Sequence, residues 1–242
     1  MNRGDPSDPA VVAAMAADAE LRHHAERFVL DACRYRYPYN FTWLGLPVIQ
    51  FPQDLIALQE LLFRVRPQIV VETGVAHGGG TVFLASILEL LGGDGKVIAV
   101  DVDIRAHNRE AIQAHPLSKR IELVEGSSTD PTVIAHIKER VGTKIAFVVL
   151  DSDHTRAHVL AELRAYGPLV RRGSYIVVLD TIVERMSKAQ IGDRPWSAGN
   201  SPMTAVHEFL REDSRFSIDR DLENTLLITV APEGYLRCDR DP

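Results

Sequence analysis

Three carboxylates in this 242-residue sequence occupy positions that suit a ligand-binding site. Asp101, Asp151 and Asp180 each end a short run rich in Val, Ile and Leu. Continuous runs of this kind are typical of strands that are buried on both faces of a parallel sheet. Because the carboxyl ends of parallel strands meet at one edge of the sheet, we expect these side chains to surround one pocket.

A glycine-rich turn supplies a second part of this pocket. Glu72, Gly74 and Gly78 lie between a predicted strand at 69–72 and a predicted helix at 80–91. Glycines let a ligand approach the backbone closely, and a helix N-terminus offers free N–H groups. The spacing is not the G-x-G-x-x-G of dinucleotide sites, and a carboxylate beside the turn favours an amine over a phosphate. The turn therefore fits S-adenosylmethionine, whose methionyl ammonium needs an acceptor, unless the glycines serve only helix–strand packing.

Polar residues after the next two strands could bind the rest of this cofactor. Asp101 is placed to accept hydrogen bonds from both ribose hydroxyls, whereas Asp103 could equally cap the following helix. Ser127 and Ser128 follow the predicted strand at 121–125 and could line the adenine edge, or they could simply form a turn.

Asp151 and Asp180 also form a suitable oxygen-ligand site for Mg²⁺. His154 lies three residues beyond Asp151, and its ordinary pKa of about 6.5 suits a general base. Three other interpretations stay open. They are Asp151 as a helix N-cap, His154 as a surface-loop residue, and His154 with His158 as a metal-binding pair.

The long segment at 184–202 carries charged residues and Trp196, and loops of this length are usually mobile or functional. We expect a lid over an acceptor, because aromatic and hydrogen-bonding groups together suit sugars and other polyhydroxyl compounds. An early aromatic loop could add acceptor contacts or could pack in the core. Its candidate residues are Tyr39, Asn40, Trp43 and Gln50.

The alternation of apolar runs and amphipathic segments after Pro67 predicts the elements that position these residues. Strands are expected at 69–72, 97–101, 121–125, 145–151, 175–180 and 226–230. Helices are expected at 80–91, 105–115, 131–140, 155–170 and 203–212. Such a chain is α/β, with a mostly parallel sheet covered by helices on both faces.

The first part of the chain has a different pattern. Apolar residues at helical spacing predict a helical arm over about 8–37, and a further helix from Pro52 to just before Pro67. We therefore divide the chain into an N-terminal helical extension with the aromatic loop, residues 1–66, and one compact S-adenosylmethionine-binding domain, residues 67–242.

Composition excludes several other classes of protein. The chain is 45% hydrophobic and 25% charged with a net charge of −6, which is typical of one folded domain rather than a disordered chain. No basic stripe indicates a nucleic-acid partner, and no apolar run is long enough to indicate a membrane span. Cys33 and Cys238 form neither a zinc motif nor a disulfide framework, and the first residues lack a secretory signal, so we expect a cytoplasmic protein. The aromatic arm could also form a subunit contact in a homo-oligomer.

Five motifs together resemble the cephalosporin hydroxylase family, also called the rhamnosyl O-methyltransferase family. They are the residues at 39–45, 50–54, 72–79, 150–154 and 193–200, and the likeness runs from about residue 25 to the C-terminus. The resemblance implies a Rossmann-like class I methyltransferase fold with a mostly parallel seven-stranded sheet and S-adenosylmethionine as the methyl donor. Members act in antibiotic tailoring and in sugar methylation, and some need Mg²⁺.

The resemblance also assigns roles to individual positions. Glu72, Gly74 and Gly78 match the donor turn, Asp101 the ribose acid, Asp151 and Asp180 the metal carboxylates, and His154 a family histidine that could deprotonate the acceptor. Leu179 is a departure, because the β-lactam-tailoring relative has two adjacent acids there. Asp153 or a water would then have to supply the missing metal ligand.

The leading hypothesis is an S-adenosylmethionine-dependent O-methyltransferase that methylates a hydroxyl of a sugar or sugar-bearing metabolite with the help of Mg²⁺. An oxidoreductase or hydroxylase is the first alternative. Its signatures are weak, because the one His-x-Glu motif, at His24 and Glu26, falls in the helical arm. The second alternative is a non-catalytic binding protein on the same fold, for which Leu179 is the main argument.

Overall fold

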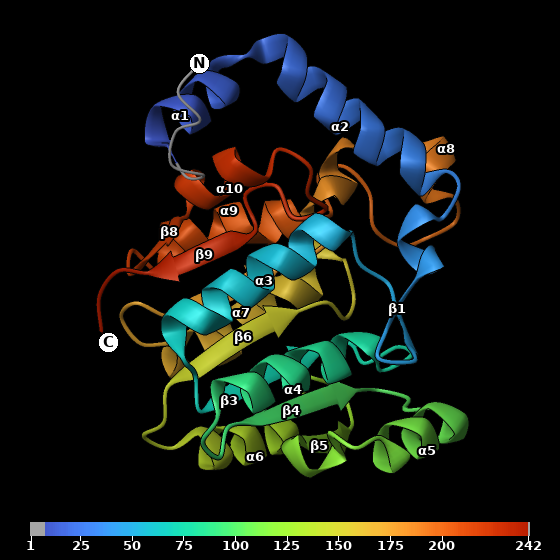
Figure 1. Ribbon diagram of the computed structural model, residues 1–242, viewed down its shortest axis with the longest axis vertical. Helices are drawn as coiled ribbons and strands as arrows, with labels where there is room; N and C mark the ends of the chain where they lie inside the picture. Colours follow the sequence, from blue (N-terminus) through green and yellow to red (C-terminus); the bar gives the residue numbers. More distant parts are fainter. Residues whose placement is uncertain (1–7, 242) are drawn as a thin grey trace.

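A seven-stranded sheet with the strand order β5-β4-β3-β6-β7-β9-β8 forms the centre of the computed structural model, which describes residues 8–241 (Figure 1). Its first five strands are parallel, and β9 runs antiparallel to both of its neighbours. The predicted α/β class and mostly parallel sheet are therefore confirmed. The strands are β3 (Ile69–Thr73), β4 (Lys96–Asp101), β5 (Ile121–Glu125), β6 (Ala146–Leu150), β7 (Tyr175–Val178), β8 (Phe216–Ile218) and β9 (Tyr235–Cys238).

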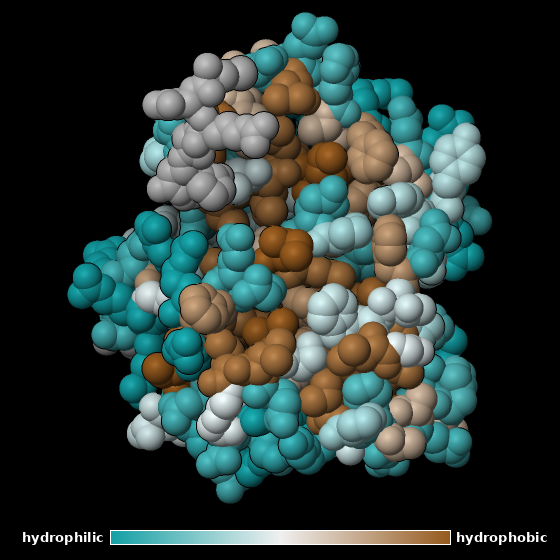
Figure 2. Space-filling model, in the orientation of Figure 1, coloured by the Kyte–Doolittle hydropathy of each residue, from teal (hydrophilic) through white to brown (hydrophobic). Residues whose placement is uncertain are grey.

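Helices cover both faces of this sheet, because alternate residues of each buried strand point to opposite sides. Val70 of β3 packs in the core shared with α3 (Pro52–Val65) and α4 (Gly79–Leu91). Its neighbour Val71 packs in the core shared with α6 (Pro131–Val141), α7 (Arg156–Tyr166) and α9 (Pro202–Glu212). Figure 2 shows apolar side chains gathered over the α3 side of the molecule. Two further helices of this part of the chain are α5 (Ala106–Ala114) and α10 (Arg220–Leu226). None of the helices in the described part is long and apolar enough to cross a bilayer.

The predicted helical arm is present but consists of two helices, α1 (Pro9–Ala17) and α2 (Ala19–Cys33). Asp18 separates them, because its side chain accepts a hydrogen bond from the Leu21 amide and so caps α2. Figure 1 shows the arm lying across the end of the molecule that also carries α10.

The aromatic loop holds structure that the sequence did not suggest. A 3₁₀ turn (Tyr37–Asn40) leads into a hairpin of β1 (Phe41–Trp43) and β2 (Leu46–Val48). Trp43 stands edge-on to Phe83 with ring centroids 4.9 Å apart, and its indole N–H donates to the Ser86 hydroxyl at 3.0 Å. Trp43 is therefore a packing residue that fixes the hairpin on α4.

The predicted strand at 226–230 is wrong. α10 ends at Leu226, and the last strand of the sheet is β9, which begins only at Tyr235. Asp219 caps α10 through the Leu222 amide, so the run begins in a helix, and Asp54 of α3 binds the Val230 amide, which holds the other end of the run outside the sheet. The three-residue β8 and the short α8 (Lys188–Ile191) were not predicted either.

Candidate active site

The predicted site residues gather where the carboxyl ends of β3, β4 and β6 meet. Two adjoining pockets there share Gly74, Ala76 and Asp151 in their walls. The first pocket also has Gln50 and Glu72 in its wall. The second has a volume of about 420 Å³. Its wall includes Asp101, Ser127, Ser128, Asp153, His158 and Trp196.

Gly74 lets the turn after β3 touch the end of β6. Its φ is +90°, and a Cβ at this position would lie 2.1 Å from the carbonyl oxygen of Asp151. Only glycine meets both conditions. Gly78 also has a positive φ, of +85°, but it lies outside both pocket walls, at the N-terminus of α4 against the Ile112 side chain.

Glu72 is buried at the floor of the first pocket. The Thr81 hydroxyl donates to its carboxylate, yet burial raises the pKa of Glu72 to about 8, with the charge of Asp101 as a smaller cause. A buried carboxylate that lacks a cationic partner is costly to ionise. A positively charged amine in this pocket would compensate that cost.

Asp101 shapes the turn as well as facing the second pocket. One carboxylate oxygen accepts from the amides of Val75 and Ala76 at 2.8 and 3.2 Å, and the other accepts from the Asp103 amide at 3.1 Å. Asp103 does not cap α5, whose N-cap residue is Arg105.

Asn108 was missed by the sequence analysis. It is buried on α5, and its side-chain amide donates to the Ala76 carbonyl at 2.7 Å. Ala76 has a φ of +47°, so Asn108 and Asp101 together hold this residue in a left-handed conformation. An asparagine within an amphipathic helix gives no sequence signal for such a role.

The two serines after β5 behave differently. Ser127 forms a local turn, because its hydroxyl accepts from the Thr129 amide at 3.3 Å. Ser128 is buried, and its hydroxyl lies 3.0 Å from Nε2 of His158. His158 therefore faces Ser128 rather than His154, and the suggested His154/His158 pair is not formed.

Asp151, His154 and Asp180 form a cluster beside the first pocket. Each offers a ligand atom that lies within 4.8 Å of the other two, and His154 Nε2 is 3.2 Å from an Asp180 oxygen. Burial raises the pKa of Asp151 well above its ordinary value, and the charges of Asp180 and Glu72 raise it further. Two carboxylates that repel each other in a partly buried site fit a divalent cation, which would offset their charge. Asp151 is not a helix cap, since α7 is capped at Thr155.

Leu179 and Asp153 add no ligand to this cluster. The Leu179 side chain is buried in the core, and the Asp153 carboxylate accepts from the Thr155 amide at 2.7 Å. Asp180 turns back toward the site because it adopts a left-handed conformation directly after Leu179, with a φ of +53°. In the described part of the chain, the third potential metal ligand beside Asp151 and Asp180 is His154.

Gln50 is the member of the early aromatic loop that reaches the site. Its side-chain amide donates to an Asp151 oxygen at 3.0 Å, and the residue is 7% exposed. Tyr39 instead lies at the surface, where the Arg36 guanidinium stacks on its ring.

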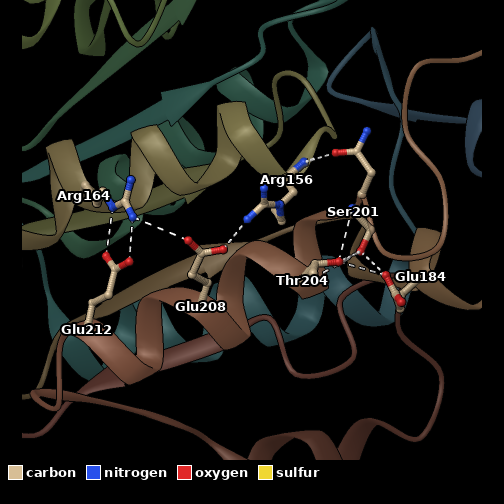
Figure 3. A network of polar contacts seen from close by, with 8 residues as sticks. Arg156, Arg164, Glu184, Ser201, Thr204, Glu208 and Glu212 are labelled. Atoms are coloured by element: carbon tan, nitrogen blue, oxygen red, sulfur yellow. Dashed lines mark hydrogen bonds and ion pairs between the residues drawn. The ribbon is translucent and has the colours of Figure 1, made fainter.

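Hydrogen bonds join the two ends of the long segment after β7. Glu184 accepts hydrogen bonds from the Gly199 amide and from the hydroxyls of Ser201 and Thr204 (Figure 3). Beside this contact, Arg156 and Arg164 of α7 pair with Glu208 and Glu212 of α9. The segment then presents Trp196 to the second pocket, edge-on to His154.

Comparisons with known proteins place the chain in a family. The rhamnosyl O-methyltransferase/CmcI family matches residues 35–239. A rhamnosyl O-methyltransferase of Mycobacterium leprae is 34% identical over 199 residues, covering 81% of this chain and 82% of that one. A protein of the same name from Mycobacterium bovis is 32% identical over 201 residues, covering 81% and 77%.

The chain belongs to the rhamnosyl O-methyltransferase/CmcI family. The resemblance seen in the motifs is thus confirmed, and the chain is an S-adenosylmethionine-dependent O-methyltransferase. The alternative hydroxylase motif has no part in the site, since Glu26 of α2 pairs with Arg185 at 2.9 Å.

Solved structures agree on the fold of this family member. A CmcI structure with Mg and SAM superposes with a TM-score of 0.57 at 21% identity, covering 83% of this chain and 77% of that one. An O-methyltransferase from Bacillus cereus in complex with SAH gives a TM-score of 0.52 at 17% identity, covering 86% and 88%. The class I methyltransferase architecture expected from the sequence is therefore confirmed.

Proposed function

We propose that this enzyme transfers the methyl group of S-adenosylmethionine to a hydroxyl of a sugar or a sugar-bearing small molecule. The carrying observation is the cluster of Asp151, His154 and Asp180, which adjoins the pocket at the glycine turn. The curated relatives are named for methylation of a rhamnosyl group, which supports a sugar acceptor.

The donor would occupy both pockets, with its adenosyl part in the larger one. In this arrangement Glu72 accepts from the methionyl ammonium, Gly74 admits the backbone approach, and Asp101 accepts from the ribose hydroxyls. Ser127 and Ser128 border the adenine, and Gly78 supports the turn from the start of α4. Burial of Glu72 and the wall positions of the other pocket residues support these roles.

Asp151 and Asp180 would hold a Mg²⁺ ion. Carboxylate oxygens are the ligands that Mg²⁺ prefers, whereas an imidazole suits transition metals, so we assign the cation to the two acids and leave His154 for proton transfer. A bound Mg²⁺ would lower the pKa of a coordinated acceptor hydroxyl.

His154 then serves as the general base. The acceptor oxygen forms a bond to the methyl carbon as the carbon–sulfur bond breaks, and the hydroxyl proton passes to the imidazole. The Asp180 carboxylate, 3.2 Å from Nε2, stabilises the resulting imidazolium. The neutral thioether product leaves with the electron pair of the broken bond.

Calorimetry and product analysis test this proposal. We expect S-adenosylhomocysteine to bind the full chain, and p-nitrophenyl α-L-rhamnoside to gain one methyl group from S-adenosylmethionine in the presence of Mg²⁺. Asp151→Asn should abolish methyl transfer, while Asp103→Asn, the same change at an exposed strand-end acid, should retain it. Failure of S-adenosylhomocysteine to bind at high micromolar concentration would overturn the donor assignment. Binding without methylation of any glycoside in a panel would overturn the acceptor class.

A further inference from the structure

His158 is a second histidine at the active-site edge, and the reaction described above does not use it. It lies in the first turns of α7, in the wall of the pocket assigned to the adenosyl group, with 24% of its side chain exposed. Its Nε2 atom faces two groups: the Ser128 hydroxyl at 3.0 Å and a Glu162 oxygen at 3.5 Å.

Glu162 decides which of these atoms carries the proton. Its side chain is fully buried, and the Ser152 hydroxyl donates at 2.7 Å to Oε1, the same oxygen that faces His158. The other oxygen, Oε2, has no hydrogen-bond partner among residues 8–241. A buried carboxylate needs hydrogen-bond donors around it. An unprotonated Nε2 would instead direct its lone pair at the Glu162 carboxylate, and the two would repel each other. Hydrogen bonding to Glu162 raises the pKa of His158, as does the charge of Asp153. Nε2 therefore carries a proton, which the Ser128 oxygen at 3.0 Å and the Glu162 oxygen at 3.5 Å share.

This proton sets the polarity of Ser128, that is, whether its hydroxyl donates or accepts a hydrogen bond toward a ligand. A serine hydroxyl has one hydrogen to donate and accepts through its lone pairs. Because the Ser128 oxygen accepts from Nε2–H, its own hydrogen must point away from the imidazole. The Ser128 carbonyl is already occupied by the Tyr166 hydroxyl at 2.5 Å, while the residue itself lines the adenosyl pocket.

We propose that His158 is a positioning residue that fixes Ser128 as a hydrogen-bond donor to an unprotonated ring nitrogen of the purine. This inference rests on the proposed donor site and adds which edge of the purine base that site recognises. The opposite polarity, with Ser128 donating to His158, would make the serine an acceptor for the exocyclic amino group instead. The two arrangements select different edges of the base.

Deaza analogues of S-adenosylhomocysteine distinguish these arrangements, because each replaces one ring nitrogen with C–H. We would measure dissociation constants of S-adenosylhomocysteine, its 1-deaza, 3-deaza and 7-deaza forms, and the form lacking the amino group. In the unchanged protein, one deaza form should bind about tenfold more weakly than S-adenosylhomocysteine.

Variants at both positions test the link between His158 and Ser128. Ser128→Ala and His158→Phe should each remove the discrimination between deaza forms. His158→Gln should retain it, because its amide N–H can replace Nε2–H. A merely structural His158 would instead weaken all analogues equally in His158→Phe. If His158→Phe does not fold, His158→Leu, which also lacks an N–H donor, takes its place.

Three results would overturn the inference while leaving the donor assignment intact. The first is equal binding of all deaza forms by the unchanged protein, and the second is discrimination that survives Ser128→Ala. The third is weaker binding of the form that lacks the amino group, with this difference disappearing in Ser128→Ala. Such a result would show the opposite polarity. Failure of S-adenosylhomocysteine itself to bind would instead refute the proposed function.

Discussion

The indole of Trp196 stands edge-on to the imidazole of His154, with ring centroids 4.7 Å apart and an interplanar angle of 78°. His154 is thus held between an aromatic ring and the Asp180 carboxylate. The Arg194 guanidinium lies 5.5 Å from the centre of the indole ring. The segment after β7 therefore contributes to the proton-transfer group as well as covering the pocket.

Replacing His154 should slow the chemical step without weakening donor binding. We expect His154→Asn to lower kcat by about 100-fold, the usual contribution of a general base. The dissociation constant of S-adenosylhomocysteine should stay the same, because His154 lies outside both donor pocket walls. His24→Asn, at an exposed position on α2, is the control. Equal kcat in both variants would remove His154 from the mechanism.

Trp196 should act through its aromatic ring. An edge-to-face pair is worth about 1 kcal/mol, so Trp196→Ala should lower kcat/KM by about fivefold, and Trp196→Phe should recover most of that loss. Steady-state kinetics at saturating donor measures both. A Phe variant as impaired as the Ala variant would argue that the indole N–H, not ring contact, matters.

Mg²⁺ should stabilise the folded protein by offsetting the repulsion between Asp151 and Asp180. At ten times its dissociation constant, Mg²⁺ should raise Tm by about 4 °C, and a chelator should reverse the shift. Asp151→Asn should lose this response. Asp103→Asn changes the same charge just beyond the end of β4 and should keep it. An identical response in the two variants would place the cation elsewhere.

Gly74 and Gly93 offer a matched pair of substitutions. Both have a positive φ, of +90° and +71°, but a Cβ meets the Asp151 carbonyl at Gly74 and nothing within 4 Å at Gly93. Gly93→Ala should therefore cost only about 1 kcal/mol of backbone strain. Gly74→Ala should cost about 3 kcal/mol and weaken binding of S-adenosylhomocysteine. Chemical unfolding and calorimetry separate the two effects, and similar values for both variants would contradict the close contact.

Asp54 should make stability depend on pH. It is fully buried, and burial raises its pKa from 3.8 to about 6, although Thr229, Tyr235 and the Val230 amide all donate to it. The folded state therefore binds the proton more tightly than the unfolded chain does. Stability from this group is present below pH 4 and is lost as the pH rises to about 6, a change of about 3 kcal/mol.

Urea unfolding between pH 4 and pH 7 measures this dependence. Asp54→Asn should reduce the slope of the curve across that window, to which Glu72 and Asp151 also contribute through their raised pKa values. Asp94→Asn, at an exposed turn, should leave the slope unchanged. An equal slope in Asp54→Asn and in the unchanged protein would assign the pH dependence to the other groups.

The parallel strands and the residues at their ends were predictable because burial on both faces leaves a continuous apolar run. β3, β4 and β6 follow that rule. The C-terminal strands do not follow it. The run at 226–230 is apolar except for Thr229, but the distant carboxylate of Asp54 binds the Val230 amide, a tertiary contact that no local pattern reveals.

Some residues of the candidate site were likewise predictable from the sequence, and others were not. Asp101 and Asp151 directly end or follow parallel strands, so topology alone brings them to one pocket. Asp180 lies two residues beyond β7 and reaches Asp151 because it adopts a left-handed conformation. Gln50 and Asn108 reach the site from a loop and a helix whose placement depends on packing, and neither has a sequence motif for that role. The polarity of Ser128 depends on a buried Glu162 that the sequence places unremarkably in an amphipathic helix.

Gly79 brings the N-terminal hairpin into direct contact with the donor turn. A Cβ there would lie 2.2 Å from the Pro47 carbonyl oxygen, so the backbones of β2 and of the first turn of α4 touch without a side chain between them. An α4 N-terminus that tightens around a bound methionyl group must move the hairpin with it.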